Sequence, residues 1–373
     1  MNKAIYMGIV AAMALASCSN DEVLREAERA DTISFRTQVA ASTRGALLDQ
    51  AALQNNNQLY VTTFKEDGEL LYPETAYNYK EGAWEANPPQ QWQGNDKLDF
   101  YLAYPALSEW SKNFALSQPS KMITFLVDEE IPNQKDYVAA RVLASKQDGT
   151  VEVKLKHMLS AIEVRVKNSN PTLKYEITGL RLCGVNKKFY YNLSRINDPS
   201  YSPLLSLAYV PEFRNYELNF EQEVRLRSDG VPHSLMGTAG CAILPPQRGS
   251  HGGETWVWDG KKTGEKGDQV GSYIGVKVRI TGGAYFPVYQ YINAHEGWVA
   301  IPMRFNWDSG KKYVYTLDFS NGAGRVDPID PGVYVRPGTL DPEKGQPIFN
   351  GPVTFTVDVS EWTNENRDVD LKQ

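Results

Sequence analysis

Apolar and polar residues alternate with a period of two along most of the chain after residue 31, and this pattern constrains the fold more than any other feature. Such alternation is typical of half-buried β-strands, whose side chains point in turn to the two faces of a sheet. Ile33, Phe35 and Val39 accordingly share one face of a predicted first strand. Two further runs flank Asp67-Gly68, a pair suited to a tight turn, and predict a hairpin over residues 59–72.

Short strands at close intervals are predicted along the remaining chain. They cover residues 98–104, 122–127, 137–143, 151–155, 161–166, 175–182, 216–220, 241–244, 273–281, 298–303, 313–319 and 353–359. The 29 Gly and 21 Pro residues interrupt the chain too often for long helices. We therefore predict an all-β fold built from β-sandwiches.

A length of 373 residues exceeds one ordinary domain and indicates two. Asn168 to Pro171 is short, polar and ends in proline, so we expect the linker there. This divides the chain into an N-terminal domain of residues 32–168 and a C-terminal domain of residues 169–373. Between Asn321 and Pro352 the chain holds six Pro and six Gly, which predicts an extended excursion before the last strand.

The amino terminus has the pattern of a signal peptide over residues 1–17, with Lys3 followed by an apolar run. Leu15-Ala16-Ser17-Cys18 resembles the bacterial lipobox, in which the cysteine is acylated and the preceding peptide removed. An ordinary signal peptide with a chance cysteine is the alternative. Residues 18–31 form an acidic tether, similar to the signal that directs lipoproteins to the outer face of the outer membrane. We expect Cys18 to anchor the chain in that membrane.

Charge and motifs exclude several functions. With 39 basic and 45 acidic residues, a net charge of −6 and no basic blocks, the chain lacks the electrostatic footprint of a nucleic-acid binder. The four histidines, including His157, have no partner at metal-ligand spacing, and His251-Gly252-Gly253-Glu254 has the composition of a turn. We expect no catalytic residues, no metal and no cofactor. Cys183 and Cys241 could form a disulfide or remain two buried thiols.

Four segments resemble the fimbrillins, the lipoprotein pilin subunits of Bacteroidetes type V pili. The most specific is Phe305 to Leu317, with a tryptophan, a glycine-lysine turn and a tyrosine-x-tyrosine strand. Ala242 to Gln247 is similar to the family's aliphatic-Pro-Gln strand end, and Leu155 to Val164 to its strand, histidine and second strand. The run from Val353 to Val359, followed by Trp362, resembles the terminal strand.

This resemblance implies two transthyretin-like β-sandwich domains in tandem, no enzymatic activity, and a place in a cell-surface fimbrium that mediates adhesion. It also implies assembly with other pilin subunits by strand exchange, after proteolysis removes the first strand. Arg44-Gly45 follows that strand in a small-residue loop, and we expect an arginine-specific protease to cut there. The roles of shaft, anchor and tip remain open.

Val353, Phe355, Val357 and Val359 form one apolar face of the last strand and are the predicted donor. An ordinary final strand of the second sandwich is the alternative for this segment. For the whole protein, the main alternative is a surface lipoprotein that binds glycans through aromatic platforms, and a weaker one is a secreted hydrolase.

Overall fold

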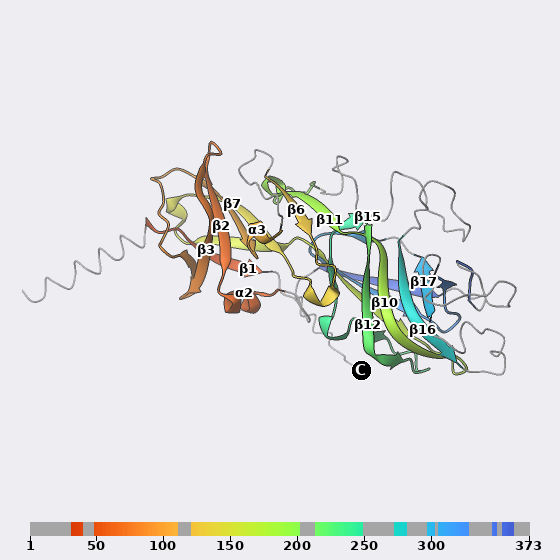
Figure 1. Ribbon diagram of the computed structural model, residues 1–373. Coiled ribbons are helices and arrows are strands. Elements are labelled where there is room, and N and C mark those ends of the chain that lie inside the picture. Colours follow the sequence, from red (N-terminus) through yellow and green to blue (C-terminus); the bar gives the residue numbers. More distant parts are fainter. Residues whose placement is uncertain are drawn as a thin grey trace, which may run out of the picture.

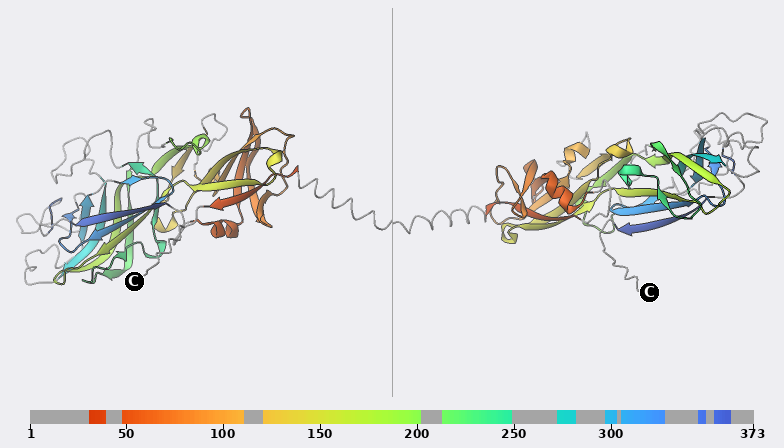
Figure 2. Two further views of the ribbon diagram at one scale, coloured as in Figure 1. Left: turned by 180° about the vertical axis from the view of Figure 1, so that it is seen from behind. Right: turned by 90° about the horizontal axis from the view of Figure 1, so that it is seen from below.

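A computed structural model describes residues 31–39, 48–110, 121–201, 213–248, 272–281, 297–302, 305–327, 345–348 and 353–361. These residues form two β units that lie end to end (Figure 1), one containing the first strand and the other the last (Figure 2). The prediction of an all-β fold is confirmed, since strands account for nearly all of the regular structure.

The first unit is a closed barrel with the strand order β1-β4-β3-β2-β5-β7-β8. Its elements are β1 (Ser34–Val39), α2 (Gln50–Asn56), β2 (Leu59–Lys65), β3 (Leu70–Lys80), β4 (Ala83–Ala86), β5 (Leu98–Tyr104), β7 (Val138–Ala144) and β8 (Val151–His157). The predicted hairpin is confirmed: Gly68 adopts φ 88° between β2 and β3. The alternation of residues predicts these strands but does not specify that the sheet closes on itself.

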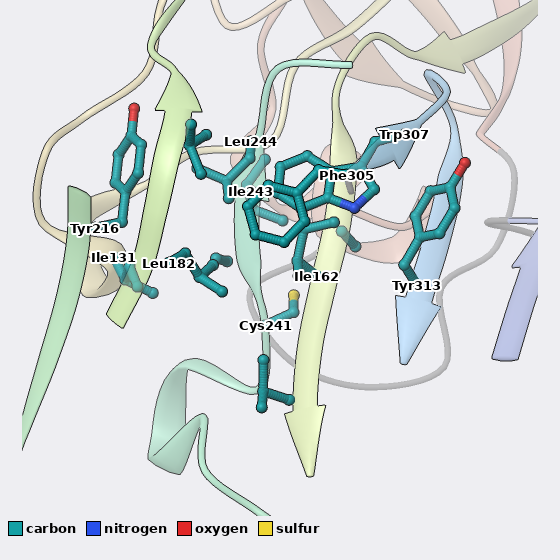
Figure 3. Packing of buried hydrophobic residues seen from close by; sticks show 14 of the residues in the cluster. Ile131, Ile162, Leu182, Tyr216, Cys241, Ile243, Leu244, Phe305, Trp307 and Tyr313 are labelled. Atoms are coloured by element: carbon teal, nitrogen blue, oxygen red, sulfur yellow. The ribbon is translucent and has the colours of Figure 1, made fainter. Parts of the chain in front are cut away.

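The second unit packs two sheets around one core. One has the order β12-β10-β16-β17-β20, and the other has the order β13-β9-β19-β21, with β14 also paired to β9. Its strands are β9 (Ser160–Lys167), β10 (Lys174–Asn186), β12 (Phe213–Arg225), β13 (His233–Ser234), β14 (Ala242–Leu244), β16 (Tyr273–Thr281), β17 (Gly297–Pro302), β19 (Lys311–Asp318), β20 (Arg325–Val326) and β21 (Thr354–Glu361). Figure 3 shows part of this core, where Ile162 of β9 and Leu182 of β10 belong to one buried cluster.

The turn that precedes β19 has the predicted structure. Gly310 adopts φ 71°, and its N–H donates to the carbonyl of Leu159 over 2.8 Å. Tyr313, Tyr315 and Leu317 of β19 then point into the core and are buried. The indole of Trp307, which lies in β18 (Asn306–Trp307), donates to the Tyr315 hydroxyl over 2.9 Å.

Sheet membership changes between β8 and β9, one strand before the predicted domain boundary. β9 runs parallel to β19 in the second unit, from Ala161 opposite Lys312 to Lys167 opposite Asp318. Asn168 is buried and donates to the carbonyls of Asn170 and Leu173. The stretch predicted as a linker is therefore a hydrogen-bonded turn between β9 and β10, because short polar segments serve turns as well as linkers.

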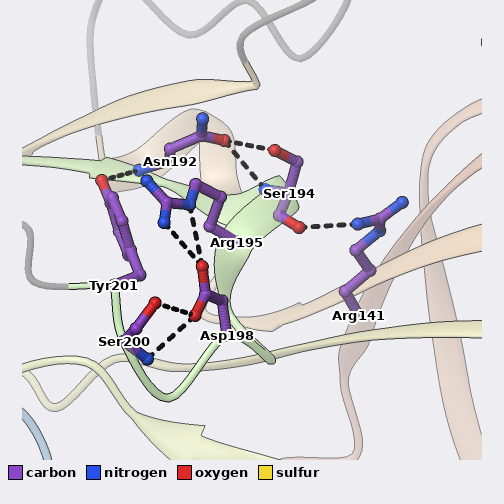
Figure 4. Close-up of polar contacts among 7 residues, drawn as sticks. All are labelled: Arg141, Asn192, Ser194, Arg195, Asp198, Ser200 and Tyr201. Atoms are coloured by element: carbon purple, nitrogen blue, oxygen red, sulfur yellow. Dashed lines mark hydrogen bonds and ion pairs between the residues drawn. The ribbon is translucent and has the colours of Figure 1, made fainter.

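Polar contacts join the two units on one side (Figure 4). Arg141 of β7 donates to the carbonyl of Ser194 at 2.6 Å, as Figure 4 shows. Within the barrel it also donates to both carboxylate oxygens of Asp99, at 2.8 and 3.0 Å. Lys156 of β8 donates to the carbonyl of Ile196, and Asn197 donates to the carbonyl of Arg141. The segment after β11 (Lys188–Asn192) is thereby fixed against the outside of the barrel.

Apolar contacts complete this junction. β6 (Met122–Leu126) pairs with β11 as a two-stranded ribbon, and α3 (Leu107–Trp110) lies beside it. The ring of Trp110 in α3 lies 4.8 Å from the ring of Phe125 in β6, tilted by 30°. Tyr101 and Ala139, from the outer face of the barrel, belong to the same buried cluster as the second core. The junction is thus packed as well as hydrogen bonded.

Cys183 and Cys241 are separate buried thiols, which decides between the two alternatives left open by the sequence. Burial raises the pKa of both, that of Cys241 to about 12. His157 is a buried structural residue, as expected: its Nδ1 lies 2.8 Å from a carboxylate oxygen of Asp136. His251-Gly252-Gly253-Glu254 lies outside the described residues.

Candidate functional site: the first and last strands

The first strand is an integral part of the barrel. β1 pairs antiparallel with β4, where Phe35 lies opposite Trp84, and parallel with β8, from Phe35 opposite Val151 to Val39 opposite Leu155. Among the described strands β1 alone joins these two, so it closes the barrel. Its alternating sequence turns Ile33, Phe35 and Val39 inward, where they are 0%, 0% and 7% exposed.

Phe35 is at the centre of an aromatic cluster inside the barrel. Its ring lies edge-on to Tyr77 at 5.4 Å and to Phe100 at 5.1 Å, and Trp92 contacts Phe100 at 5.5 Å. Edge-to-face rings at such separations stabilise a core beyond the area that they bury. Removing β1 would take one ring from this cluster and leave the others facing a cavity.

Thr37 provides the polar contacts of β1. Its hydroxyl accepts a hydrogen bond from the indole Nε1 of Trp84 at 2.9 Å and another from the Gln50 amide at 3.3 Å. The Gln50 side chain also accepts from the backbone N–H of Val39 at 2.9 Å. Sequence reasoning missed this set, although Thr37 occupies an inward position between Phe35 and Val39 and that position was the available signal.

A buried carboxylate fixes the backbone at Leu48. One oxygen of Asp136 accepts from the backbone N–H of Leu48 at 3.1 Å and contacts His157 at 2.8 Å. The side chains of Asp136 and His157 are both 1% exposed. Leu48 is therefore fixed to the barrel independently of β1.

The last strand lies at the edge of its sheet. β21 pairs with β19 over its whole length, from Thr354 opposite Asp318 to Glu361 opposite Lys311. Among the described residues, no strand pairs with its other edge. Figure 2 shows β21, in the darkest blue, at this outer position. Unpaired edge groups of this kind favour addition of a further strand.

The four predicted donor residues fall into two environments. Val353 is 8% exposed and belongs to the second core, whereas Phe355, Val357 and Val359 are 40%, 38% and 54% exposed. In the single chain the predicted apolar face is therefore buried at Val353 alone, and its other three residues are exposed. An edge strand has neighbours on one side only, so its side chains are covered less than those of a central strand.

The segment before β21 is attached to the second core. Ile348 is fully buried, and its N–H donates to the carbonyl of Gly324 at 2.9 Å. The N–H of Gly345 donates to the carbonyl of Val326 at 2.9 Å. The exposed strand thus begins directly after the buried Val353, and Ile348 is anchored earlier in the same segment.

The other predicted site residues, Cys18, Arg44 and Gly45, lie outside the described residues, as does Trp362. The structure places β1 and β21 in different units, so within one chain they do not meet. Every tryptophan in the described part of the chain is buried: Trp84, Trp92, Trp110, Trp298 and Trp307. In that same part, His, Cys, Asp and Glu side chains form no group of three or more suited to a metal ion.

The family model described as "Fimbrillin-like" matches residues 43–329. This match covers most of the chain. The chain belongs to the fimbrillin-like family. The resemblance noted in the sequence is therefore confirmed. No curated protein matches the sequence.

Several solved structures are similar to this chain at low sequence identity. A candidate cell adhesion protein of Bacteroides ovatus is 14% identical, with a TM-score of 0.47 over 90% of this chain and 99% of that chain. A candidate cell adhesion protein of Parabacteroides distasonis is 14% identical, with a TM-score of 0.46 over 90% and 98%. A fimbrial assembly protein of the same species is 9% identical, with a TM-score of 0.35 over 78% and 92%.

The described helices were also compared with the requirements for crossing a bilayer. All of them are too short or too polar to serve as a membrane-spanning segment.

Proposed function

We propose that this fimbrillin-like protein is a structural subunit of a cell-surface pilus that mediates adhesion and assembles by strand exchange. The observation that carries the proposal is the contrast between two terminal strands: β1 is buried between β4 and β8, whereas β21 exposes three apolar side chains at a free sheet edge. A chain with both features can lose one strand and supply another. The adhesion role is taken from the names of the similar solved structures.

Processing is proposed at Arg44-Gly45, in the segment that follows β1. Cleavage there would release Ile33, Phe35 and Val39 and expose the edges of β4 and β8. At about 1.5–3 kcal/mol for each fully buried large apolar side chain, the open barrel forgoes roughly 5–9 kcal/mol until a strand of another subunit fills it. This deficit would drive polymerisation.

Export as a lipoprotein is the proposed first step. Acylated Cys18 would hold the precursor at the outer membrane until an arginine-specific protease separates it from the anchor. Replacing Cys18 by Ser should release the protein from membranes or leave its signal peptide uncleaved. An unchanged membrane fraction with unchanged fatty-acid labelling would contradict this step.

The tryptophans of the described residues do not favour the alternative of glycan binding through aromatic platforms. All tryptophans in that part of the chain are buried and cannot stack on a sugar. We therefore retain the pilus subunit as the one proposed function.

Two experiments test the proposal. Mass spectrometry of purified filaments should find a mature chain that begins at Gly45; an acylated Cys18 terminus in every assembled copy would contradict processing. Deleting residues 354–373 should leave folded monomers that do not polymerise, because Ile348 and Val353 remain to close the second core. Loss of folded protein would instead identify β21 as an ordinary final strand.

A further inference from the structure

The last strand repeats the residue pattern of the first. Residues 33–39 read ISFRTQV and residues 353–359 read VTFTVDV. Large apolar residues occupy the first, third and seventh positions of both segments, and the third is phenylalanine in each. In the structure, Phe35 is fully buried in the barrel while Phe355 is 40% exposed at a sheet edge.

We propose that β21 of one copy enters the place of β1 in another in a single register, running in the direction of β1 with Phe355 in the position of Phe35. The occupant is thus the last strand of a second copy, parallel to β8 and antiparallel to β4. This inference rests on the proposed function, which supplies the vacated place. It adds the direction of the incoming strand and the position of each of its side chains.

Side-chain size favours this register. The Phe35 position is bounded by the rings of Tyr77 and Phe100, at 5.4 and 5.1 Å, and requires a ring. If β21 entered in the reverse direction, or shifted by two residues either way, a valine would occupy the position of Phe35. Reversal and one of the two slides also force Phe355 into the position of Thr37, beside the Trp84 indole. Only Phe355 in place of Phe35 fills the cluster without overfilling its neighbour.

Charge on the outer face favours the same direction. Gln38 of β1 lies opposite exposed Lys154 of β8, and Asp358 takes the position of Gln38 in the proposed register. The incoming strand therefore gains an ion pair with Lys154. In the reversed strand Asp358 would occupy the position of Ser34, directly opposite Glu85 of β4. Like charges directly opposite across a strand pair are destabilising.

Ser34 and Thr354 correspond in the same way. The Ser34 hydroxyl donates to the Thr150 hydroxyl at 3.1 Å, and the hydroxyl of Thr354 can make this bond from the same position. Val353 takes the position of Ile33. To do so it must leave the core of the second unit, in which it is 8% exposed.

One position is imperfect and gives the proposal a distinctive consequence. Val357 takes the position of Thr37 but has no hydroxyl to accept from the Trp84 indole and the Gln50 amide. The assembled barrel would therefore hold a buried indole N–H that has lost its acceptor. Replacing Val357 by Thr should restore it and slow subunit dissociation about tenfold. The matched Val359→Thr change lies at the position of Val39. It should speed dissociation, because it buries a hydroxyl that the Trp84 indole does not reach.

Cysteine pairs determine the register directly. In chains that begin at Gly45, Asp358→Cys with Lys154→Cys should form an intermolecular disulfide under mild oxidation, because the two positions are opposite in neighbouring strands. Thr354→Cys with Lys154→Cys reports the reversed strand. Thr356→Cys with Lys154→Cys reports the slide that puts Phe355 at the position of Thr37. The natural Cys183 and Cys241 are buried and unpaired.

The outcomes separate the register from the proposed function. Cross-linking of the Asp358 pair in polymers, without cross-linking of the other two, supports the register. Polymers that cross-link through the Thr354 or Thr356 pair, or through none, overturn the register and leave strand exchange standing. If the unsubstituted chain beginning at Gly45 forms no polymer, the proposed function fails and the register with it.

Discussion

The indole N–H of Trp84 donates to the hydroxyl of Thr37 across the β1–β4 pair, over 2.9 Å inside the barrel. This bond joins the strand proposed to leave the barrel with a strand that stays. Both side chains are buried, so the indole N–H has no water to replace its acceptor. The stability of the unprocessed barrel therefore depends on a threonine hydroxyl within an otherwise apolar face of β1.

Replacing Thr37 by Val should destabilise the unprocessed protein by about 1–3 kcal/mol, because the shape is kept while the Trp84 and Gln50 donors lose their acceptor. Denaturant unfolding followed by tryptophan fluorescence measures this change. Thr37→Ser keeps the hydroxyl and is the matched control. Equal stability of the Val variant and the unsubstituted protein would contradict the assignment of this bond.

The two phenylalanines of the terminal strands should differ sharply in the unprocessed monomer. Phe35→Ala should cost about 3–5 kcal/mol, since it opens a cavity in the aromatic cluster. Phe355→Ala should change the free energy of unfolding far less, because that side chain is 40% exposed. Chemical unfolding of both variants gives the comparison. Similar losses for the two would show that β21 is packed as tightly as β1.

Arg141 should contribute more to stability than a typical surface arginine. It is 28% exposed, binds both oxygens of Asp99 and donates to the carbonyl of Ser194 in the neighbouring unit. Hydrogen bonds to the Asp99 carboxylate raise the pKa of its guanidinium. Arg141→Ala should lower the free energy of unfolding by about 1.5–3 kcal/mol.

Arg36 provides the control for this prediction. Its ion pair with Glu152 joins side chains that are 60% and 62% exposed, and water screens such pairs. Arg36→Ala should therefore leave the midpoint of thermal unfolding nearly unchanged.

Small-angle X-ray scattering of the Arg141 variant should in addition show a wider distribution of distances between the two units.

Glu163 should make the pairing of β9 with β19 sensitive to acid. Burial alone would raise the pKa of Glu163, but hydrogen bonds from Arg165 and Lys312 outweigh it and leave the pKa below its ordinary value of 4.5. A carboxylate with a lowered pKa in the folded state contributes stability above its unfolded pKa, and loses this contribution as the pH falls through the folded value. Stability should thus decrease as the pH falls below about 4.5.

Urea unfolding of the unsubstituted protein and of Glu163→Gln, measured between about pH 6 and pH 3, tests this dependence. The Gln variant should be less stable near neutrality, because Lys312 and Arg165 lose their carboxylate partner. Its stability should also fall less steeply in acid. Parallel curves for the two proteins would assign the acid sensitivity to other carboxylates.

Much of the local structure followed from period-two alternation and turn chemistry. The strands predicted at residues 98–104 and 273–281 coincide with β5 and β16. The helix α2 was missed, although Asp49 caps it by accepting from the N–H of Ala52. β4 was missed because its four residues are too few to establish a period.

The candidate site needed the tertiary structure. Residues 33–39 and 353–359 alternate alike, so their sequences determine which side chains share a face and nothing about how deeply that face is buried. Burial depends on neighbours: β1 lies between β4 and β8, whereas β21 pairs with β19 alone among the described strands. Period-two alternation is a local property of the chain, but the pairing of Phe35 with Val151 joins distant segments. Only the folded chain decided which of two similar strands closes a barrel and which lies exposed at an edge.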